Sequence, residues 1–584
     1  MGVATPPPWA RVVPCKAEGT PLAKLKLTSL LCTIKSAATM VKLGLAPLAL
    51  LSAGASLVDA EALPRTGTAG GRHDQPAHIA EVGPAPATMN PVAYHITNPA
   101  PGQEGVTRPF SSAEFFEVDS PHLKMKYAEV AWTLLPPVAL PPHIVARYAA
   151  SSIAITGFEV DVLRPLPGNK TESVPAYQSY NHHYGVTLYS AATKLKRGAD
   201  GEPAGMDMGH GKLFEYELLR DKPAPPADAR LAQHFIHGNG QEHRQMFHGA
   251  PPGYAQPLYA PGTFALAPMQ ISTNDGTGRR SGAGGVLPRI KLPAGATPAD
   301  PGAKYSPLLE CPCTDRVAIN GSAGTVNGHR MNGDCTRDEP LSDLLARKNP
   351  TCAAATYTGG LACCVNNMTL LDADQSPPLP DFEDDVFFRF RFYFEDYAPS
   401  RHQLLEHVEW ASNGCDSGCG GDCPNRCNHI EFDVVEGAGS ALGADVQVFQ
   451  STYKAGDMLA ATCSMTSGQC MDGSKVDDAK GFKLMMAASH CHAPNCIRQE
   501  LLNLDSGEVL CNGTTVLGGS DLTYDEEGYL FTPPCLWGDG EGDGLLPPPV
   551  LMKNTTLQMV TVFNSTFWHP GQMGIWQMKA AIVQ

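Results

Sequence analysis

Proline and glycine are so frequent in this chain that long helices have little room to form. The 584 residues include 58 glycines and 51 prolines, and only 17% are charged. Proline removes a backbone donor and glycine weakens the interior of a helix, so both favour turns between short segments. Long segments with the apolar spacing of a helix are hard to find. The composition therefore predicts an all-β fold of many short strands.

Two parts of the chain carry strand patterns. In the first, SIAITGFEVDVL (152–163) and YGVTLYS (184–190) are separated by Pro, Gly and Asn turns, which predicts a β domain over residues 106–300. In the second, FFRFRFYF from Phe387 alternates apolar and charged residues, as a half-buried strand does. We place this run near the start of a second β domain over residues 380–584.

Cysteines are concentrated between and within these predicted domains. Six of them fall between Cys311 and Cys364, so residues 301–379 are predicted to form a disulfide-stapled connector. A comb of four, CDSGCGGDCPNRC (415–427), lies in the second domain. Zinc and iron–sulfur ligation are alternatives there, but Gly and Pro prevent one regular helix from presenting all four sulfurs, so we favour disulfides.

The first 60 residues have the layout of a secretory signal. An apolar stretch at 43–51 is followed by small residues and a candidate cleavage point after Ala60. The signal has an ordinary length if translation begins at Met40. A buried or transit-type helix is the alternative interpretation. Residues 61–105 are rich in Ala, Pro and Gly with few large apolar side chains, so we expect a flexible leader.

The remaining chain also fits export to the cell wall or extracellular matrix. Sixteen cysteines remain after the first 60 residues, an even number that suits disulfides. The net charge is −16 for the whole chain, which disfavours nucleic acid as a partner. No later apolar run is long enough for stable membrane insertion. The sequence also holds six candidate N-glycosylation sites, at Asn169, Asn320, Asn367, Asn512, Asn554 and Asn564.

The octapeptide SHCHAPNC places two histidines two residues apart. On a strand His490 and His492 share one face, while Cys491 faces the other way. This separates a candidate ligand pair from a candidate disulfide. We expect Cys491 to be oxidised, with Cys496 the nearest partner, and not to bind metal.

A methionine near the C-terminus completes a candidate metal site. The segment HPGQMG places Met573 just before another apolar run. Two imidazoles and a thioether suit copper, because soft sulfur stabilises Cu(I) and imidazole tolerates both oxidation states. Zinc rarely binds methionine.

A second histidine pair lies in SYNHHYGV. On a regular strand the adjacent His182 and His183 point to opposite faces, so joint coordination requires a twist or bulge. The alternative for each pair is ordinary buried or surface histidine with hydrogen-bonded neighbours. No G-x-S-x-G, P-loop or dinucleotide fingerprint supports a hydrolase, kinase or nicotinamide enzyme.

Several segments together resemble a known family. GGLACC, HIEFDV, HCH followed by LDSGEVLC, EEGYLFTPPC and HPGQMGIW resemble the stress up-regulated nodulin ("Nod nineteen") family over residues 115–584. That family is distantly similar to the copper type II, ascorbate-dependent monooxygenases, peptidylglycine α-hydroxylating and dopamine β-monooxygenase. The resemblance implies two jelly-roll-like antiparallel β-sandwich domains, each with one copper ion.

The resemblance also implies a ligand set for each copper. An electron-transfer copper is expected at His182, His183 and a later histidine, and an oxygen-activating copper at His490, His492 and Met573. Ascorbate is the implied reductant, and the implied reaction is hydroxylation of a C–H bond in an unknown small or extracellular substrate.

Two positions depart from the expected pattern. Gln270 in LAPMQIS stands where the third imidazole of the first site is expected, and an amide is a poor Cu(I) ligand. Ala488 stands where the amidating enzymes have an arginine, which disfavours peptide amidation. The alternative function is a non-catalytic, stress-related extracellular glycoprotein with one or no working copper site. Other candidates for the missing imidazole are His234, His237, His243 and His248.

Overall fold

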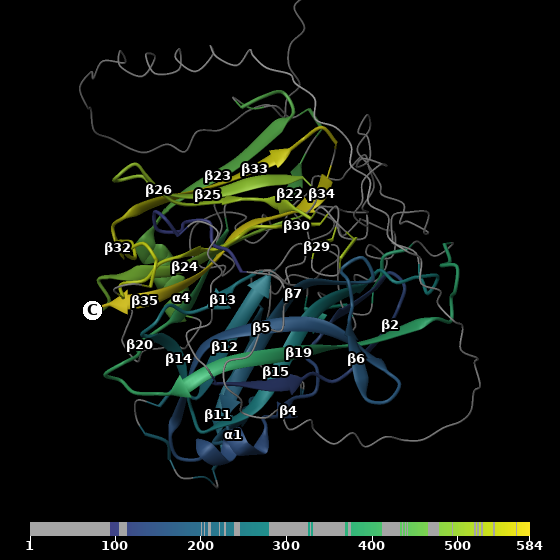
Figure 1. Ribbon diagram of the computed structural model, residues 1–584, viewed down its shortest axis with the longest axis horizontal. Helices are drawn as coiled ribbons and strands as arrows, with labels where there is room; N and C mark the ends of the chain where they lie inside the picture. The colour runs from purple at the N-terminus through teal and green to yellow at the C-terminus, as the bar shows by residue number, and fades with distance from the viewer. Residues whose placement is uncertain are drawn as a thin grey trace, which may run out of the picture. The chain divides into compact units, whose positions relative to one another are not determined.

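A computed structural model gives the fold (Figure 1). It describes residues 94–103, 114–199, 201, 203, 205–207, 212–220, 222, 224–226, 229–238, 246–278, 325–326, 329–330, 368–371, 375–411, 432–434, 436–437, 440, 442–464, 478–492, 495–518, 521–522, 525–526, 529–540, 543–567 and 569–584. All of them belong to one compact unit, Pro76–Gln584. The predicted signal segment, the cysteine comb, most of the predicted connector, His243, Asn320 and Asn367 lie outside the described residues.

The first sandwich is built from two sheets. One contains β1 (Glu114–Asp119), β2 (Leu123–Lys126), β5 (Ser152–Leu166), β6 (Lys170–Ser173), β13 (His248–Gly249), β14 (Tyr254–Tyr259), β19 (Glu383–Asp396) and β20 (Gln403–Leu404). The other contains β3 (Glu129–Trp132), β4 (Val138–Ala139), β7 (Ser179–Ser190), β12 (Ala232–Gly238), β15 (Pro261–Ser272) and β18 (Met368–Thr369). A shared apolar core joins side chains from both sheets.

The strand β19 belongs to this first sandwich, which corrects the predicted boundary at residue 380. It pairs with β1 on one side and with β5 on the other, and Figure 1 shows β19 beside β5. Its even-numbered phenylalanines enter the core, while Arg389 and Arg391 face the other way and bind Asp119 and Glu117 of β1 at 2.7 and 2.6 Å. The alternation predicted a half-buried strand, and the acidic residues on β1 decide its partner.

The second sandwich follows the same plan. One sheet contains β21 (Glu406–Ala411), β24 (Gly481–Cys491), β31 (Cys535–Leu536), β32 (Val550–Met552) and β35 (Gly574–Val583). The other contains β23 (Val446–Lys454), β25 (Cys496–Asn503), β26 (Glu508–Thr514) and β33 (Thr556–Asn564). Two disulfides, Cys491–Cys496 and Cys511–Cys535, each join a strand of one sheet to a strand of the other. The predicted all-β sandwich fold is confirmed.

Short elements complete the described structure. The helices are α1 (Pro142–Arg147) and α4 (Ala455–Ser464). The two-stranded ladders are β8 (Thr193–Leu195) with β11 (Tyr216–Leu218), β9 (Gly205–Asp207) with β10 (Lys212–Phe214), β16 (Thr325–Val326) with β17 (His329–Arg330), β22 (Phe432–Val434) with β34 (His569–Gln572), β27 (Val516–Leu517) with β30 (Leu530–Phe531), and β28 (Asp521–Leu522) with β29 (Asp525–Glu526). Within the described part of the chain, no helix has both the length and the apolar character needed to cross a bilayer.

Residues 94–98 are packed, although they fall in the segment predicted to be a flexible leader. The Tyr94 hydroxyl donates to Glu159 of the first sandwich at 2.8 Å, and Tyr393 donates to the other oxygen of that carboxyl at 2.6 Å. The backbone N–H of Thr97 donates to the carbonyl of Pro534 in the second sandwich at 2.8 Å. A single large aromatic residue anchors this segment, which average composition does not reveal.

We expect the Tyr94→Phe variant to be less stable by about 1–3 kcal/mol, because it leaves a buried carboxyl oxygen with one donor fewer. Burial and the neighbouring Glu159 charge hold the pKa of Tyr94 well above its usual value, so the phenol stays a donor at neutral pH. Urea unfolding measures the change. Tyr259→Phe on β14 is the control, and an equal loss in both variants would contradict a specific stabilising role of the Tyr94–Glu159 hydrogen bond.

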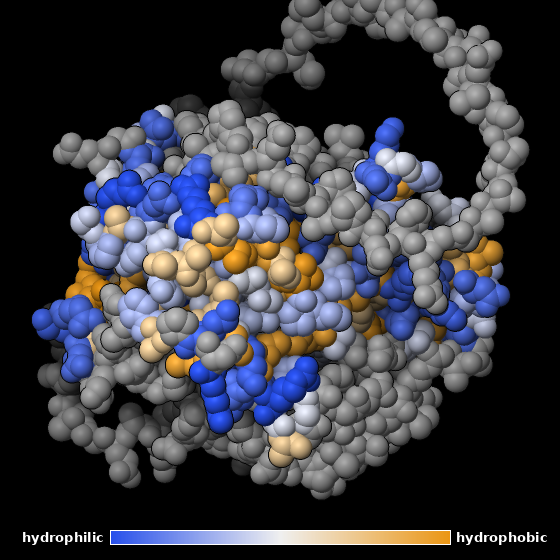
Figure 2. All heavy atoms as spheres, turned by 90° about the horizontal axis from the view of Figure 1, so that it is seen from below, coloured by the Kyte–Doolittle hydropathy of each residue, from blue (hydrophilic) through white to orange (hydrophobic). Residues whose placement is uncertain are grey.

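The large exposed apolar side chains among the described residues are scattered. Figure 2 shows hydrophilic and hydrophobic residues interspersed over the described part of the face that it presents. Large exposed apolar side chains such as Leu218, Leu442 and Val550 come from separate elements, which is usual for globular proteins. The buried polar residues are more informative about chemistry.

Candidate metal centre

The adjacent histidines of the first sandwich sit at a β-bulge. In the pairing of β7 with β15, His183 lies opposite Met269 and Asn181 lies opposite Gln270, so His182 is an extra residue on β7. A bulge turns neighbouring side chains away from strict alternation. The His182 and His183 ring centres are 5.4 Å apart. The bulge that joint coordination requires is therefore present at these two residues.

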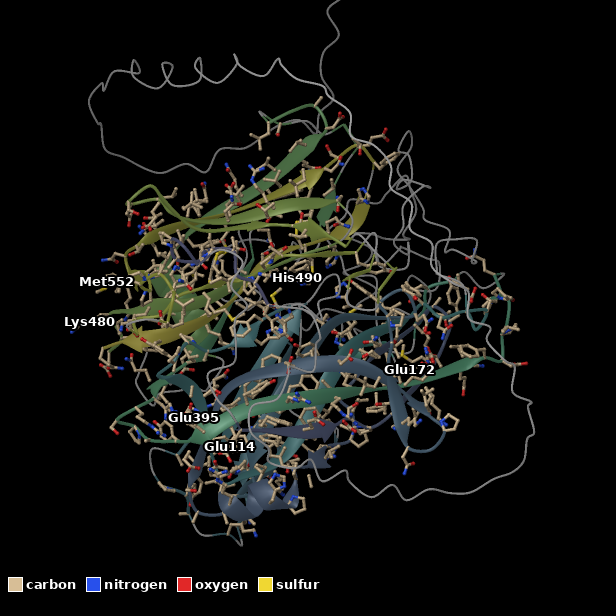
Figure 3. The ribbon with its side chains drawn as sticks, viewed as in Figure 1. Glu114, Glu172, Glu395, Lys480, His490 and Met552 are labelled. Atoms are coloured by element: carbon tan, nitrogen blue, oxygen red, sulfur yellow. A yellow bond between two sulfur atoms is a disulfide. The ribbon has the colours of Figure 1, made fainter. Side chains whose placement is uncertain are left out.

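The H-x-H pair of the second sandwich lies where β24 ends. His490 and Cys491 pair with Ile575 and Gly574 of β35, and the two imidazole ring centres are 5.2 Å apart. Figure 3 labels His490 among the packed side chains of this region. Cys491 forms a disulfide with Cys496, with 6.0 Å between their Cα atoms, as predicted. Its sulfur is therefore engaged away from any metal.

The C-terminal methionine returns to the same strand end. The pairing of β24 with β35 ends at Cys491 and Gly574, and His492 and Met573 are the next residues of the two segments beyond that end. Met573 is buried, with 2% of its surface exposed. The pairing of β24 with β35 thus gives the fold-back on which the predicted ligand set depends.

The two histidine pairs meet in one cluster, which we call the four-histidine cluster: His182, His183, His490 and His492. The His182 ring centre is 4.6 Å from that of His492 and 6.1 Å from that of His490. All four side chains are buried, with at most 1% exposed. The resemblance implied two separate sites, one in each domain, whereas the structure places the two histidine pairs beside each other.

The spacing of the rings suits coordination of one ion. Imidazoles that bind one metal ion at about 2.0–2.1 Å have ring centres about 4.5–5.5 Å apart. Three of the four measured separations fall in that range, and that of His182 and His490 is slightly longer. Among the described residues, no group of three or more His, Cys, Asp or Glu is arranged so that it could hold a metal ion. Binding therefore requires the rings to turn toward a common point.

Gln270 does not replace the missing third histidine. Its carbonyl oxygen accepts a hydrogen bond from the Asn181 amide at 3.0 Å, and its amide nitrogen donates to the Ser179 hydroxyl at 2.8 Å. The imidazole that lies closest to the His182 ring is instead that of His492, which belongs to the other sandwich. Sequence reasoning missed this, because no local pattern links positions some three hundred residues apart.

The other candidate histidines lie elsewhere. His234 is within 3.0 Å of the Thr187 hydroxyl, and His237 and His248 have ring centres 4.5 Å apart. His248 also stacks on Phe158 at 4.4 Å. Both His237 and His248 line a separate cavity, described below. None of these three is in a measured ring contact with the four-histidine cluster.

The predicted glycosylation sites agree with an exposed position wherever the structure describes them. The side chains of these asparagines are exposed: Asn169, Asn512, Asn554 and Asn564. A glycan requires an accessible asparagine, so none of the four is excluded by burial.

Fold and site together define the class as an all-β, disulfide-containing sandwich protein with a buried four-histidine cluster between two sandwiches. A scan of the chain against protein-family models and a search of curated proteins both find no match.

Proposed function

We propose that this is an extracellular copper-binding protein with one copper centre shared by its two sandwiches. The observation that carries the proposal is the 4.6 Å separation between the His182 and His492 rings, which come from different sandwiches. We assign His182, His183, His490 and His492 as imidazole ligands and Met573 as the thioether ligand. This donor set suits copper in both oxidation states.

The protein's own residues hold these ligands in place. The bulge on β7 fixes the direction of His182, and the Cys491–Cys496 disulfide ties the end of β24 to β25. Burial of the cluster keeps water away from the ligands. Copper, when bound, supplies one-electron redox chemistry, and a thioether favours its reduced form.

We also propose secretion and glycosylation. The two disulfides fit an oxidising compartment, and the four described sequons are exposed. Membership of the stress up-regulated nodulin family, inferred from the segments quoted above, belongs to the same proposal. Cell wall or extracellular matrix is the location that it implies.

An ascorbate-dependent monooxygenase is the second candidate function. It is supported by the return of the chain at Met573 to the strand end that carries His490 and His492, the three residues for which the resemblance implies an oxygen-activating copper. One feature favours the non-catalytic alternative: a single shared centre leaves no separate electron-transfer copper, and one Cu(I) donates only one electron.

Copper stoichiometry with oxygen uptake distinguishes these functions. One tight equivalent without ascorbate-driven oxygen consumption supports a non-catalytic copper protein. Two equivalents with ascorbate-driven oxygen consumption support the monooxygenase and contradict the single shared centre. Purified protein that binds no copper overturns both proposals.

The Met573→Leu variant is expected to bind Cu(I) about 10-fold more weakly while its Cu(II) affinity changes little, because thioether sulfur prefers the reduced ion. Competition with a Cu(I)-specific chelator and a separate Cu(II) titration measure the two affinities. Met559→Leu, at a buried core position on β33, is the matched control. Equal losses for both oxidation states would contradict the assignment of Met573 as a ligand.

A further inference from the structure

A cavity apart from the four-histidine cluster lies where β5, β12 and β13 of the first sandwich face β21, β24 and β35 of the second. Its volume is about 40 Å³, enough for about three water molecules. Its wall is largely apolar, with Phe158, Phe235 and Met485 among its lining residues. One lysine, Lys579, also lines it.

Lys579 is positioned by the strands around it. It lies on β35 opposite His407 of β21 and Met486 of β24. Its Nζ donates to the Gln256 side-chain oxygen at 2.9 Å and lies 5.7 Å from the centre of the Phe235 ring. No described carboxylate lies within ion-pair distance of this nitrogen. The residue as a whole is half-buried, whereas its amine lies in the buried, apolar wall.

Burial disfavours the protonated form of Lys579. Burial lowers the pKa of Lys579 to about 7, and the Glu406 charge only partly opposes this effect. The imidazoles facing the amine are those of His234 and His237 on β12, His248 on β13 and His407 on β21. Burial also lowers the pKa values of His234, His248 and His407, so these three are neutral at pH 7.

We propose that Lys579 is a nucleophilic amine that forms an imine with a short aldehyde of about three non-hydrogen atoms bound in this cavity. A desolvated lysine in an apolar pocket is the setting in which proteins form imines. The cavity size sets the length of the aldehyde. An uncharged ligand is favoured because the described lining residues include no Asp, Glu or Arg and burial favours the neutral form of Lys579.

The reaction balances without an oxidant or a reductant. The Nζ lone pair attacks the carbonyl carbon and forms a C–N bond while the carbonyl π electrons move to oxygen. A proton passes from nitrogen to that oxygen to give a carbinolamine. The hydroxyl then leaves as water with a second proton from nitrogen, and a C=N bond forms. Gln256, which accepts from Nζ, keeps the amine directed during the attack.

The test is reductive trapping on the whole, unmodified protein. Acetaldehyde is added with sodium cyanoborohydride at pH 7, and peptide mass spectrometry locates the ethylated lysines. Lys483 on the adjacent strand β24 is the internal control, because it is ion-paired with Asp539 at 2.8 Å. We expect Lys579 to be labelled at least 10-fold faster than Lys483, with labelling of Lys579 half-maximal near pH 7.

Benzaldehyde provides the control for size. It exceeds the cavity, so we expect it to label Lys579 at least 10-fold more slowly than acetaldehyde, relative to Lys483. Labelling of Lys579 no faster than Lys483, or equal labelling by both aldehydes, would overturn the proposal. The measurement needs no variant, so misfolding cannot affect it. The labelling of Lys579 is also independent of copper, because we expect the same labelling in metal-free protein.

Discussion

Replacing His182 by alanine is expected to weaken copper binding by a factor of about 100 or more, because even outer-shell partners of a ligand contribute about 10–100-fold. With the proposed shared centre, this loss affects the single copper ion that we assign to the protein. His182 is in ring contact with His183, His490 and His492, so it is the histidine through which the two pairs are connected. Removing the His182 ring therefore removes contacts to histidines of both sandwiches.

This result separates one shared centre from two independent ones. With separate sites, His182→Ala protein retains one copper at His490 and His492 with unchanged affinity. With a shared centre, the His182→Ala and His492→Ala variants lose affinity to a similar degree, and the double variant loses little more than either. Calorimetric titration gives stoichiometry and affinity, and electron paramagnetic resonance of the Cu(II) form reports the number of nitrogen ligands.

A matched control for these variants is His402→Ala. His402 is also a buried histidine, 6% exposed, but it pairs with Glu395 at 3.3 Å rather than joining the cluster. Its variant is expected to bind copper as the wild type does. Thermal unfolding of the four metal-free variants and of the wild type shows whether each protein is folded. If folded His182→Ala protein still binds one equivalent of copper with the affinity of the wild type, the shared centre is refuted.

Acid is expected to destabilise the protein through His234, by about 3 kcal/mol between pH 7 and pH 4. The side chain is 7% exposed, and burial, helped by the positive charge of Lys579, lowers the pKa of His234 to about 3. In the unfolded chain histidine takes up its proton near pH 6.5. The unfolded state therefore binds more protons within this window, and stability falls as the pH falls from about 6.5 toward 3.

The His234→Gln variant tests this dependence. Glutamine does not titrate and still reaches the Thr187 hydroxyl, which lies 3.0 Å from the His234 ring nitrogen. Urea unfolding at intervals from pH 7 to pH 4 is expected to show a shallower decline for the variant. His122→Gln, at an exposed histidine of the first sandwich, serves as the control. A decline as steep in His234→Gln as in wild type would show that His234 is not responsible.

Several features of the site follow from local sequence alone. Period-two geometry put His490 and His492 on one face, and it set Cys491 apart to pair with Cys496, which the structure confirms. The same geometry required a bulge at His182 and His183, and a bulge is there. These inferences hold because side-chain direction along a strand depends only on neighbouring residues.

The choice of partner strands did not follow from local sequence. The alternating run from Phe387 was predicted as a strand and is one, β19, but its partners β1 and β5 place it in the first sandwich. The segment at Tyr94 was predicted to be flexible, yet its one aromatic side chain anchors it to Glu159. Such pairings depend on complementary faces that lie hundreds of residues apart.

The sequence by itself determined the all-β class, the direction of the histidines on their strands and the oxidised state of Cys491. Only the tertiary structure decided that His182 meets His492, and that Lys579 lies in an apolar cavity. The physical reason is that the two features depend on interactions of different range along the chain. Backbone alternation fixes where each side chain points, whereas the burial of whole sheet faces fixes which of those side chains come together.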